Sequence, residues 1–381
     1  MKKYSFFFPL LLMVIVVGLD GCKSGDDLTA SSASELNKTI YAGNQDGNIY
    51  AVDATTGQKI WSFSTGGVFY SSPAVANGLV YVNGYEGKSL YAIDASTGQK
   101  KWVFAISDAV YGVTDSSPLA ATNGVVYVGG EKTLYAVDAL SGQKKWSFVA
   151  GFITSNPTVA SGVVYVAGEG KLYAIDANTG QKKWTFTISI NGLLNYRITD
   201  AIVANGLVYI GTQNKLLYAI DATTGQKKWT FTTDEQVIES PTVANGLVYF
   251  SSYSGTFYAI DANTGQRKWT FTANSQSGIP TVANGLVYFG SYDWNLYALD
   301  ATTGQKKWTF RFGGSIKSPT VANGVVYVGG GYNNADKNLY AIDATTGQKK
   351  WTFAANGQMN YSPCVVDKQG KIYRSIGNVR P

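Results

Sequence analysis

The sequence predicts an all-β fold, an eight-bladed β-propeller with four-stranded antiparallel blades whose N- and C-terminal strands join to close the ring. Three observations lead to this prediction: a segment that recurs eight times, four short strands in each period, and a strand that is missing at the start and reappears at the end. The recurring segment reads Leu-Tyr-Ala-Ile-Asp-Ala-Thr-Thr-Gly-Gln-Lys-Lys-Trp-Thr-Phe, with small changes between copies. A period of about 40 residues is typical of propellers and other repeat architectures.

The repeat is regular along the chain from residue 39 onward. Successive copies lie 38 to 45 residues apart, and in every copy a tryptophan follows the aspartate by eight residues. The aspartates are Asp53, Asp94, Asp138, Asp176, Asp221, Asp261, Asp300 and Asp343. The tryptophans, which we expect to be structural docking residues between blades, are Trp61, Trp102, Trp146, Trp184, Trp229, Trp269, Trp308 and Trp351.

Each period contains four short strands, as the unit that begins at Ser240 shows. We expect strands at 241–244, 247–251, 257–261 and 268–272, with Asn245-Gly246 forming a hairpin turn between the first two. The second strand is apolar throughout rather than alternating, so both of its faces must be covered. Sheets stacked face to face around an axis provide that cover, as the blades of a propeller do.

The two ends of the repeat region favour a closed ring. Residues 39–41 match a second strand and have no first strand before them, whereas residues 362–366 match the missing first strand. Pairing the two would close the ring and protect an otherwise exposed strand edge. Residues 371–375 match a further second strand, which is one strand more than eight four-stranded blades require, and the sequence leaves open which copy is displaced.

The pattern Ala-x-Asp-x-x-Thr-Gly-x-x-x-Trp resembles the tryptophan-docking motif of quinoprotein-like (PQQ-type) β-propeller repeats. All eight copies match it, with Ser141 as the one departure. The resemblance implies that each tryptophan wedges between adjacent blades. The glycine permits a left-handed turn and the aspartate caps that turn.

The same family includes dehydrogenases that bind pyrroloquinoline quinone and calcium, which is an enzyme alternative for this chain. Many of those enzymes carry two adjacent cysteines, and here the two cysteines lie far apart at positions 22 and 364. The available acids Asp200, Asp234, Glu239 and Asp293 lie in no motif of that family. We therefore expect no catalytic residues, no metal site and no cofactor.

Composition excludes several kinds of catalytic site. There is no histidine, so the commonest general base and the imidazole metal ligands are missing. Fifteen of the thirty-one basic residues directly precede the repeat tryptophans, and eight of the twenty-five acids are the repeat aspartates. The remaining charges are nearly balanced, so we expect no nucleic-acid partner. Lysine on outer strands is typical of protection against edge-to-edge aggregation, and an acidic partner or anionic lipid is the alternative.

The chain divides into three expected parts. Residues 1–21 resemble a lipoprotein signal peptide, since two lysines precede an apolar stretch that ends in Leu-Asp-Gly-Cys. Cys22 is the expected lipid-attachment residue, although Asp20 departs from the small residue that is usual there. Residues 22–38 form a flexible tether, and residues 39–381 form the propeller.

Comparison of the eight copies places the variation on one side. The connections between strands one and two and between three and four barely change, whereas the others vary in length and content. The two variable sets emerge on the same side of a propeller, where function usually lies in loops. They include the aromatic residues Phe152 and Tyr253. The candidate binding residues are Tyr196, Arg197, Glu239, Tyr292, Asp293, Trp294, Arg311 and Lys317.

These features favour a non-catalytic, lipid-anchored and monomeric scaffold that binds a protein of the bacterial cell envelope. The chain resembles the propeller lipoproteins of the outer-membrane β-barrel assembly machine in length, anchor and blade number. That resemblance implies a role in outer-membrane protein assembly, at the periplasmic face of the outer membrane or at the cell surface. A surface module that binds carbohydrate or another extracellular ligand through Tyr196, Tyr292 and Trp294 is the second alternative.

Overall fold

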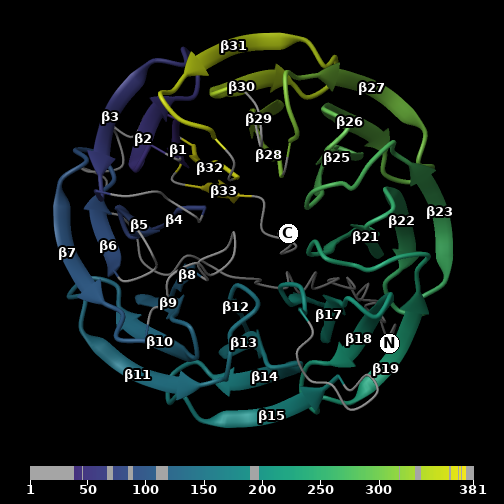
Figure 1. The fold of residues 1–381 in the computed structure, drawn as a ribbon, viewed down its shortest axis with the longest axis horizontal. Coiled ribbons are helices and arrows are strands. Elements are labelled where there is room, and N and C mark those ends of the chain that lie inside the picture. Colours follow the sequence, from purple (N-terminus) through teal and green to yellow (C-terminus); the bar gives the residue numbers. More distant parts are fainter. Residues whose placement is uncertain are drawn as a thin grey trace, which may run out of the picture.

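The computed structural model describes residues 38–44, 46–66, 72–84, 89–108, 119–188, 197–316, 318–330, 336–359, 362–367, 369 and 371–374. Within these ranges every regular element is a β-strand, and the strands form eight sheets around a central axis (Figure 1). The described residues include no helix that is long and apolar enough to cross a bilayer. The predicted eight-bladed propeller is confirmed.

The first four blades follow the chain from the N-terminal side. Blade 1 contains β1 (Thr39–Gly43), β2 (Asn48–Asp53), β3 (Lys59–Ser64), β32 (Cys364–Val366) and β33 (Ile372–Arg374). Blade 2 contains β4 (Ala74–Ala76), β5 (Leu79–Asn83), β6 (Ser89–Asp94) and β7 (Lys100–Ala105). Blade 3 contains β8 (Leu119–Thr122), β9 (Val125–Gly129), β10 (Thr133–Asp138) and β11 (Lys144–Val149). Blade 4 contains β12 (Thr158–Ala160), β13 (Val163–Gly168), β14 (Lys171–Asp176) and β15 (Lys182–Thr187).

The other four blades repeat the same order, with the fourth strand of each on the outer rim (Figure 1). Blade 5 contains β16 (Ile202–Ala204), β17 (Leu207–Gly211), β18 (Leu216–Asp221) and β19 (Lys227–Thr232). Blade 6 contains β20 (Thr242–Ala244), β21 (Leu247–Ser251), β22 (Thr256–Asp261) and β23 (Arg267–Thr272). Blade 7 contains β24 (Thr281–Ala283), β25 (Leu286–Gly290), β26 (Asn295–Asp300) and β27 (Lys306–Arg311). Blade 8 contains β28 (Thr320–Ala322), β29 (Val325–Gly329), β30 (Asn338–Asp343) and β31 (Lys349–Ala354).

Blade 1 closes the ring with strands from both ends of the described chain. β32 pairs antiparallel with β1, with Ile40 opposite Val365, as the sequence predicts. The extra strand displaces neither copy, because β33 pairs with β32 and becomes a fifth strand at the inner edge of the sheet. The surplus strand thus belongs to a five-stranded closing blade.

The repeat tryptophans dock between blades. The Trp269 indole of blade 6 packs over the turn of blade 7, and its N–H donates to the Ala301 carbonyl at 3.1 Å. A Cβ added to Gly304 in that turn would lie 2.6 Å from the indole, so only glycine fits beneath the ring. All eight tryptophans cover the corresponding glycine of the next blade, including Trp351 over blade 1.

A tyrosine from the second strand shares the carbonyl that receives each tryptophan. Tyr249 is buried, and its hydroxyl donates to the Ala301 carbonyl at 3.0 Å, beside the bond from Trp269. Burial raises the pKa of Tyr249 to about 12, so the hydroxyl stays a donor at any ordinary pH. The equivalent hydrogen bond recurs in every blade. In blade 5 it is made by Tyr209, while the Trp229 N–H has no acceptor in reach among the described residues.

A register shift explains the pair of basic residues that precedes seven of the eight repeat tryptophans. In blade 6, Ala259 lies opposite Trp269 and Ile260 lies opposite Arg267, so Lys268 is the extra residue of a β-bulge. Its ammonium reaches the repeat aspartate Asp261 at 3.3 Å. The same ion pair forms in the seven blades that have lysine at this position. The basic residue directly before the tryptophan therefore stabilises the turn, in addition to any protection of the outer strand edge against pairing.

The repeat aspartates hold the turns that receive the tryptophans. In blade 5, Asp221 Oδ1 accepts the backbone N–H of Thr223 at 3.1 Å and of Thr224 at 2.9 Å, together with the Thr224 hydroxyl. Asp221 Oδ2 pairs with Lys228 at 3.2 Å. The Thr224 N–H, followed by Lys228, lowers the pKa of Asp221 to about 2.

We expect acid to destabilise the propeller between about pH 4 and pH 2. Seven repeat aspartates have a lowered pKa in the folded state, to about 2 for Asp221 and Asp343, so their stabilising effect is complete above the ordinary value and is lost as the pH falls through the folded value. The urea midpoint should be constant from pH 6 to 5 and should fall below pH 4. Asp221→Asn should reduce the size of that fall, and a midpoint unchanged down to pH 2 would contradict the assignment.

Candidate binding face around Trp294

The connections between second and third strands lie beside the connections that link one blade to the next. Ile153 precedes the first strand of blade 4 and forms a bridge with Gly168, at the end of the second strand of that blade. Corresponding bridges join Ile198 to Thr212 and Ser277 to Ser291. Both variable sets of loops therefore share one side of the ring, which we call the variable face. The opposite side, formed by the uniform turns, is called the constant face.

Trp294 lies on the variable face in a backbone conformation that glycine adopts elsewhere. Its φ is +75°, and the equivalent positions of blades 1 and 6 are Gly47 at +82° and Gly255 at +91°. A bulky residue in this left-handed region costs of order 1–3 kcal/mol and persists only where the surroundings enforce it. The side chain is nevertheless 40% exposed, so burial does not account for its presence.

Arg311 holds the exposed indole from the neighbouring strand β27. Its guanidinium carbon lies 5.4 Å from the centre of the Trp294 ring, and its Nη1 donates to the Asp293 carbonyl at 3.4 Å. The Trp294 backbone is fixed on both sides, since its N–H donates to the Ser291 carbonyl and its carbonyl accepts the Phe312 N–H. Trp294 and Arg311 thus form a prearranged aromatic and cationic surface.

Asp293 has a different role from its predicted neighbours. Its carboxylate accepts hydrogen bonds from the Tyr297 hydroxyl at 2.7 Å and from the backbone N–H of Asn274 at 3.2 Å. It also accepts the backbone N–H and the side-chain amide of Asn295, each at 3.1 Å. Burial, with the help of Asp293, raises the pKa of Tyr297 to about 12. The carboxylate of Asp293 is therefore occupied by hydrogen bonds within the loop that carries Trp294.

The Asp293 arrangement is repeated in other blades and was not predicted from the sequence. Asp46 with Asn48 and Tyr50 makes the same set of hydrogen bonds in blade 1. Asp336, Asn338 and Tyr340 make it again in blade 8. The signal was visible as the spacing Asp-x-Asn-x-Tyr, which occurs in these three copies.

The remaining candidate residues either lie elsewhere on the variable face or lie outside the described residues. Arg197 is exposed on the variable face, where its N–H donates to Gln213 Oε1 at 3.2 Å in blade 5. Glu239 and Tyr292 are half-buried in the loops of the same face, and both have interaction partners. The structure brings Asp293, Trp294 and Arg311 into contact, whereas Arg197 and Glu239 belong to other blades. Cys22, Tyr196 and Lys317 lie outside the described residues.

Two other aromatic side chains are exposed on this face. Tyr253 occupies the same loop of blade 6 as Tyr292 does in blade 7, and 57% of its surface is exposed. Phe152 is exposed beside blade 4, with the Lys132 ammonium 4.6 Å from its ring centre. Together with Trp294 they give the variable face a set of aromatic anchors of the kind found at binding hot spots.

The inner wall of the ring carries one carboxylate that is held between blades. Asp200 Oδ1 and Oδ2 accept the backbone N–H and the side-chain amide of Asn156 in blade 4, at 2.7 and 2.8 Å. Its own N–H donates to the Ser240 hydroxyl of blade 6. Burial outweighs these hydrogen bonds and raises the pKa of Asp200. Its effect on stability is therefore opposite to that of the repeat aspartates and favours folding at lower pH.

The acidic side chains of the described residues do not gather into a calcium site. No three acidic or cysteine side chains of the described residues come together in a group that could hold a metal ion. Asp234 is occupied by the hydroxyls of Ser254, Thr256 and Tyr258 at 2.6 to 2.9 Å. Asp200 is held by Asn156, and Asp293 by Tyr297.

Solved structures share this fold at low sequence identity. BamB from Moraxella catarrhalis matches with a TM-score of 0.65 and 20% identity, over 82% of this chain and 91% of that chain. The computationally designed protein Ika8 matches with a TM-score of 0.65 and 17% identity, over 80% and 95%. The quinohemoprotein alcohol dehydrogenase ADHIIG from Pseudomonas putida HK5 matches with a TM-score of 0.61 and 18% identity, over 77% and 68%.

Family membership rests on the sequence. No curated protein sequence matches the chain. The model of one repeat family matches residues 21–147, 107–197, 189–277 and 271–368, which together cover all the propeller strands except β33. That family is described as outer membrane protein assembly factor BamB. With eight docking tryptophans and a BamB-like ring, the chain belongs to the family of the outer membrane protein assembly factor BamB.

Proposed function

We propose that this protein is a lipid-anchored, non-catalytic scaffold that binds a protein of the bacterial cell envelope through the surface around Trp294. The BamB-like propeller supports a protein-binding role in general. The observation that carries the specific proposal is the exposed indole of Trp294 at φ +75°, where two other blades have glycine. Backbone strain at an exposed aromatic residue favours a functional origin.

The neighbouring groups suit a protein partner. Tryptophan, tyrosine and arginine are the residues most enriched at binding hot spots, and Trp294, Tyr253 and Arg311 supply all three on the variable face. Hydrogen bonds fix the Trp294 backbone, and Arg311 lies against the indole before any partner arrives, so little conformational entropy is lost on binding. Membership of the BamB family favours a component of outer-membrane protein assembly as that partner.

The membrane anchor is part of the same proposal. Cys22 in the lipobox-like segment is the residue that would carry the lipid, and this lipid would hold the protein at the outer membrane, at its periplasmic face or at the cell surface. Labelling of cells with a palmitate analogue should mark the natural chain and leave Cys22→Ser unmarked. Protease treatment of intact cells separates the two locations, and digestion of the propeller would favour an extracellular ligand.

We expect Trp294→Gly to remove binding while leaving the fold intact. The variant restores the residue of blades 1 and 6, so the relief of backbone strain offsets the lost contacts and the free energy of unfolding should change by less than about 1 kcal/mol. Loss of a hot-spot tryptophan should weaken binding of the partner at least about thirtyfold, which corresponds to about 2 kcal/mol. The measurement is photo-crosslinking in the cell envelope from the exposed position 253 of the same face, which keeps Trp294 in place, followed by titration of the purified partner with the natural chain and with Trp294→Gly.

Two controls separate this surface from the rest of the protein. Lys215→Gly changes the equivalent loop position of blade 5, where φ is +64°, and should leave binding within a factor of two. A crosslinker at Leu140, which is exposed on the constant face, should capture no assembly component. Equal losses from the two glycine variants would overturn the site, and retention of an oligosaccharide rather than a protein would support the carbohydrate alternative.

A further inference from the structure

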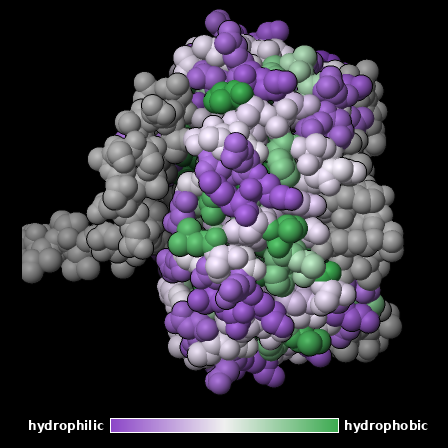
Figure 2. Space-filling view, turned by 90° about the vertical axis from the view of Figure 1, so that its left-hand side faces the viewer, coloured by the Kyte–Doolittle hydropathy of each residue, from purple (hydrophilic) through white to green (hydrophobic). Residues whose placement is uncertain are grey.

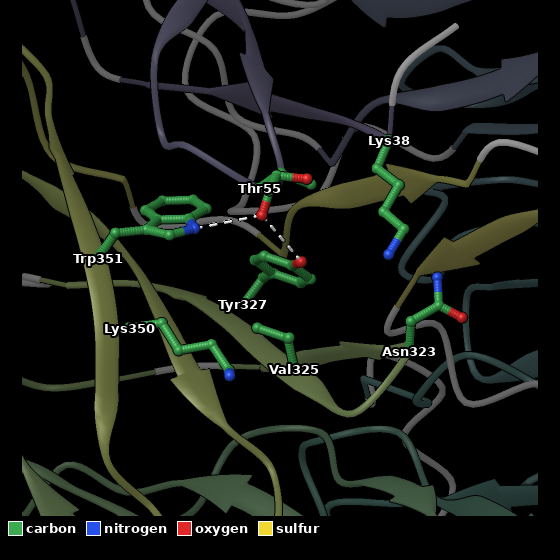
Figure 3. Close-up of a pocket in the computed structure, with 8 residues that line it drawn as sticks. Lys38, Thr55, Asn323, Val325, Tyr327, Lys350 and Trp351 are labelled. Carbon is green, nitrogen blue, oxygen red and sulfur yellow. Dashed lines mark hydrogen bonds between the residues drawn. The ribbon is translucent and has the colours of Figure 1, made fainter.

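The contact between blades 8 and 1, where the ring closes, contains a cavity of about 440 Å³ (Figure 3). Its walls are Trp351, Tyr327 and Val325 of blade 8 and the turn of blade 1 at Ala54 and Thr55. Both aromatic residues donate to the Ala54 carbonyl, at 3.2 and 3.3 Å, so the wall is rigid. The cavity opens on the constant face, because the turns that line it belong to that side.

Lys38 gives this cavity a character that the other seven blade contacts lack. Its carbonyl accepts the Ala54 N–H at 2.8 Å, just as the Gly78 carbonyl accepts the Ala95 N–H in blade 2. The other blades have glycine at this place, as part of an Asn-Gly turn or, in blade 4, of the turn Ser161-Gly162, so only the closing contact carries a side chain here. Figure 3 shows the Lys38 ammonium directed at the cavity, opposite the amide of Asn323.

The charge of the cavity is positive. Lys38 has no ion-pair partner in the part of the chain that the structure describes. Lys350 also lines the cavity and shares its charge with Asp343 at 3.2 Å. Two ammonium groups, an amide and the Thr55 hydroxyl thus surround a space with an aromatic wall. Such a set of donors suits an anionic group attached to an apolar body.

The outer rim next to the constant face is also cationic. In each blade the fourth strand begins with a basic residue that is exposed, and within the described ranges none of these eight has an ion pair. They are Lys59, Lys100, Lys144, Lys182, Lys227, Arg267, Lys306 and Lys349. Fifteen rim cations against eight repeat aspartates leave an excess of seven positive charges, spread around the circumference. Figure 2 shows hydrophilic groups in clusters along the rim, with hydrophobic groups between them.

We propose that the constant face docks on an anionic phospholipid surface, with the closing cavity binding one phosphate-bearing headgroup. Charges distributed around a ring fit a planar surface better than they fit a compact acidic protein. The chain from Cys22 also joins the propeller through Lys38, on this face, so the inference rests on the proposed lipid anchor for its orientation. Docking would turn the variable face, with Trp294, away from the membrane.

The test is cosedimentation of the unacylated chain with vesicles. The chain from residue 22 onward, carrying Cys22→Ser, contains every described residue and has no lipid of its own. It should bind vesicles of phosphatidylcholine with about 30% phosphatidylglycerol and should not bind pure phosphatidylcholine, and raising the salt from 0.05 to 0.5 M should release it. Absence of binding to the anionic vesicles would overturn the proposal.

Matched variants distinguish this face from overall charge. The triple variant Lys182→Gln, Lys227→Gln, Lys306→Gln should weaken anionic-vesicle binding at least about tenfold. The control Lys132→Gln, Arg197→Gln, Lys215→Gln removes the same charge from the variable face and should change it less than twofold. Equal effects would overturn the assignment of the face.

Lys38→Gly tests the cavity by restoring the residue of the other seven blades. It should weaken binding to the anionic vesicles about threefold, with near-ultraviolet circular dichroism unchanged. An effect no larger than that of Lys132→Gln alone would overturn the headgroup site. Because these chains carry no lipid and need no protein partner, failure here leaves the Trp294 proposal untouched, and failure of that proposal leaves this result intact.

Discussion

Replacement of Trp269 by alanine is expected to lower the free energy of unfolding by about 3–5 kcal/mol, the largest loss that we expect from any single side-chain replacement in the propeller. The indole is only 9% exposed and stacks on Phe257 with ring centres 5.9 Å apart. It covers Gly304 of the next blade and donates to Ala301, so its removal opens a cavity between two blades. Chemical denaturation followed by circular dichroism measures the effect.

Two further variants identify the source of that stability. Trp269→Phe keeps an aromatic ring in the space but loses the N–H that donates to Ala301, so we expect a cost of about 1–2 kcal/mol. Trp294→Ala removes the one tryptophan outside the repeat motif and should cost less than about 1 kcal/mol, because it is exposed. Equal losses for Trp269→Ala and Trp294→Ala would contradict the division between docking and binding tryptophans.

The blades could be predicted from the sequence because each signal was local and repeated. The Asn245-Gly246 pair takes φ values of +50° and +75°, as the hairpin turn requires, and β21 occupies the predicted residues 247–251. The closing strand was predictable because its absence at one end matched its presence at the other. The fate of residues 371–375 was not, since a fifth strand depends on free space at the inner edge of blade 1, which no local pattern reports.

Contacts between blades were harder to predict than the blades themselves. The tyrosine of each second strand reads as an ordinary apolar strand residue, yet Tyr249 reaches across to a carbonyl 52 positions later in the chain.

Within a blade, the ion pair between Lys268 and Asp261 depends on a β-bulge that shifts one residue out of register. The sequence therefore suggested edge protection for all the rim lysines, whereas one of the two in most blades stabilises a turn.

The candidate binding surface was predictable in outline only. Variation among the copies located the loops, and Trp294 and Arg311 do come together there. The same reasoning could not distinguish Asp293 from the exposed groups beside it. The Asp293 carboxylate accepts hydrogen bonds from Tyr297 and Asn295 and is not available to a partner. The left-handed backbone at Trp294 was also not predicted. Alignment of its loop with those of blades 1 and 6, where Gly47 and Gly255 take the same position, would have indicated it.

Removal of the C-terminal strands is expected to have the largest effect of all. A chain that ends at residue 361 loses β32, whose Cys364, Val365 and Val366 are buried and pair with β1. Burial of three such side chains contributes about 5–8 kcal/mol, comparable to the whole stability of a typical domain. The exposed edge of β1 would then be a template for pairing with another chain. We expect this truncation to lose its cooperative unfolding transition and to aggregate.

A chain that ends at Asp367 separates ring closure from the fifth strand. It keeps the pairing of β32 with β1 and loses only β33, whose pairing with β32 spans three residues. It should remain monomeric and fold cooperatively, with a loss of about 1–3 kcal/mol, because β33 covers an edge without joining the two ends of the ring. Thermal unfolding and light scattering of the two truncations give the comparison. If both chains failed equally, β33 rather than β32 would be the strand on which closure depends, and the surplus strand would be an essential part of the propeller.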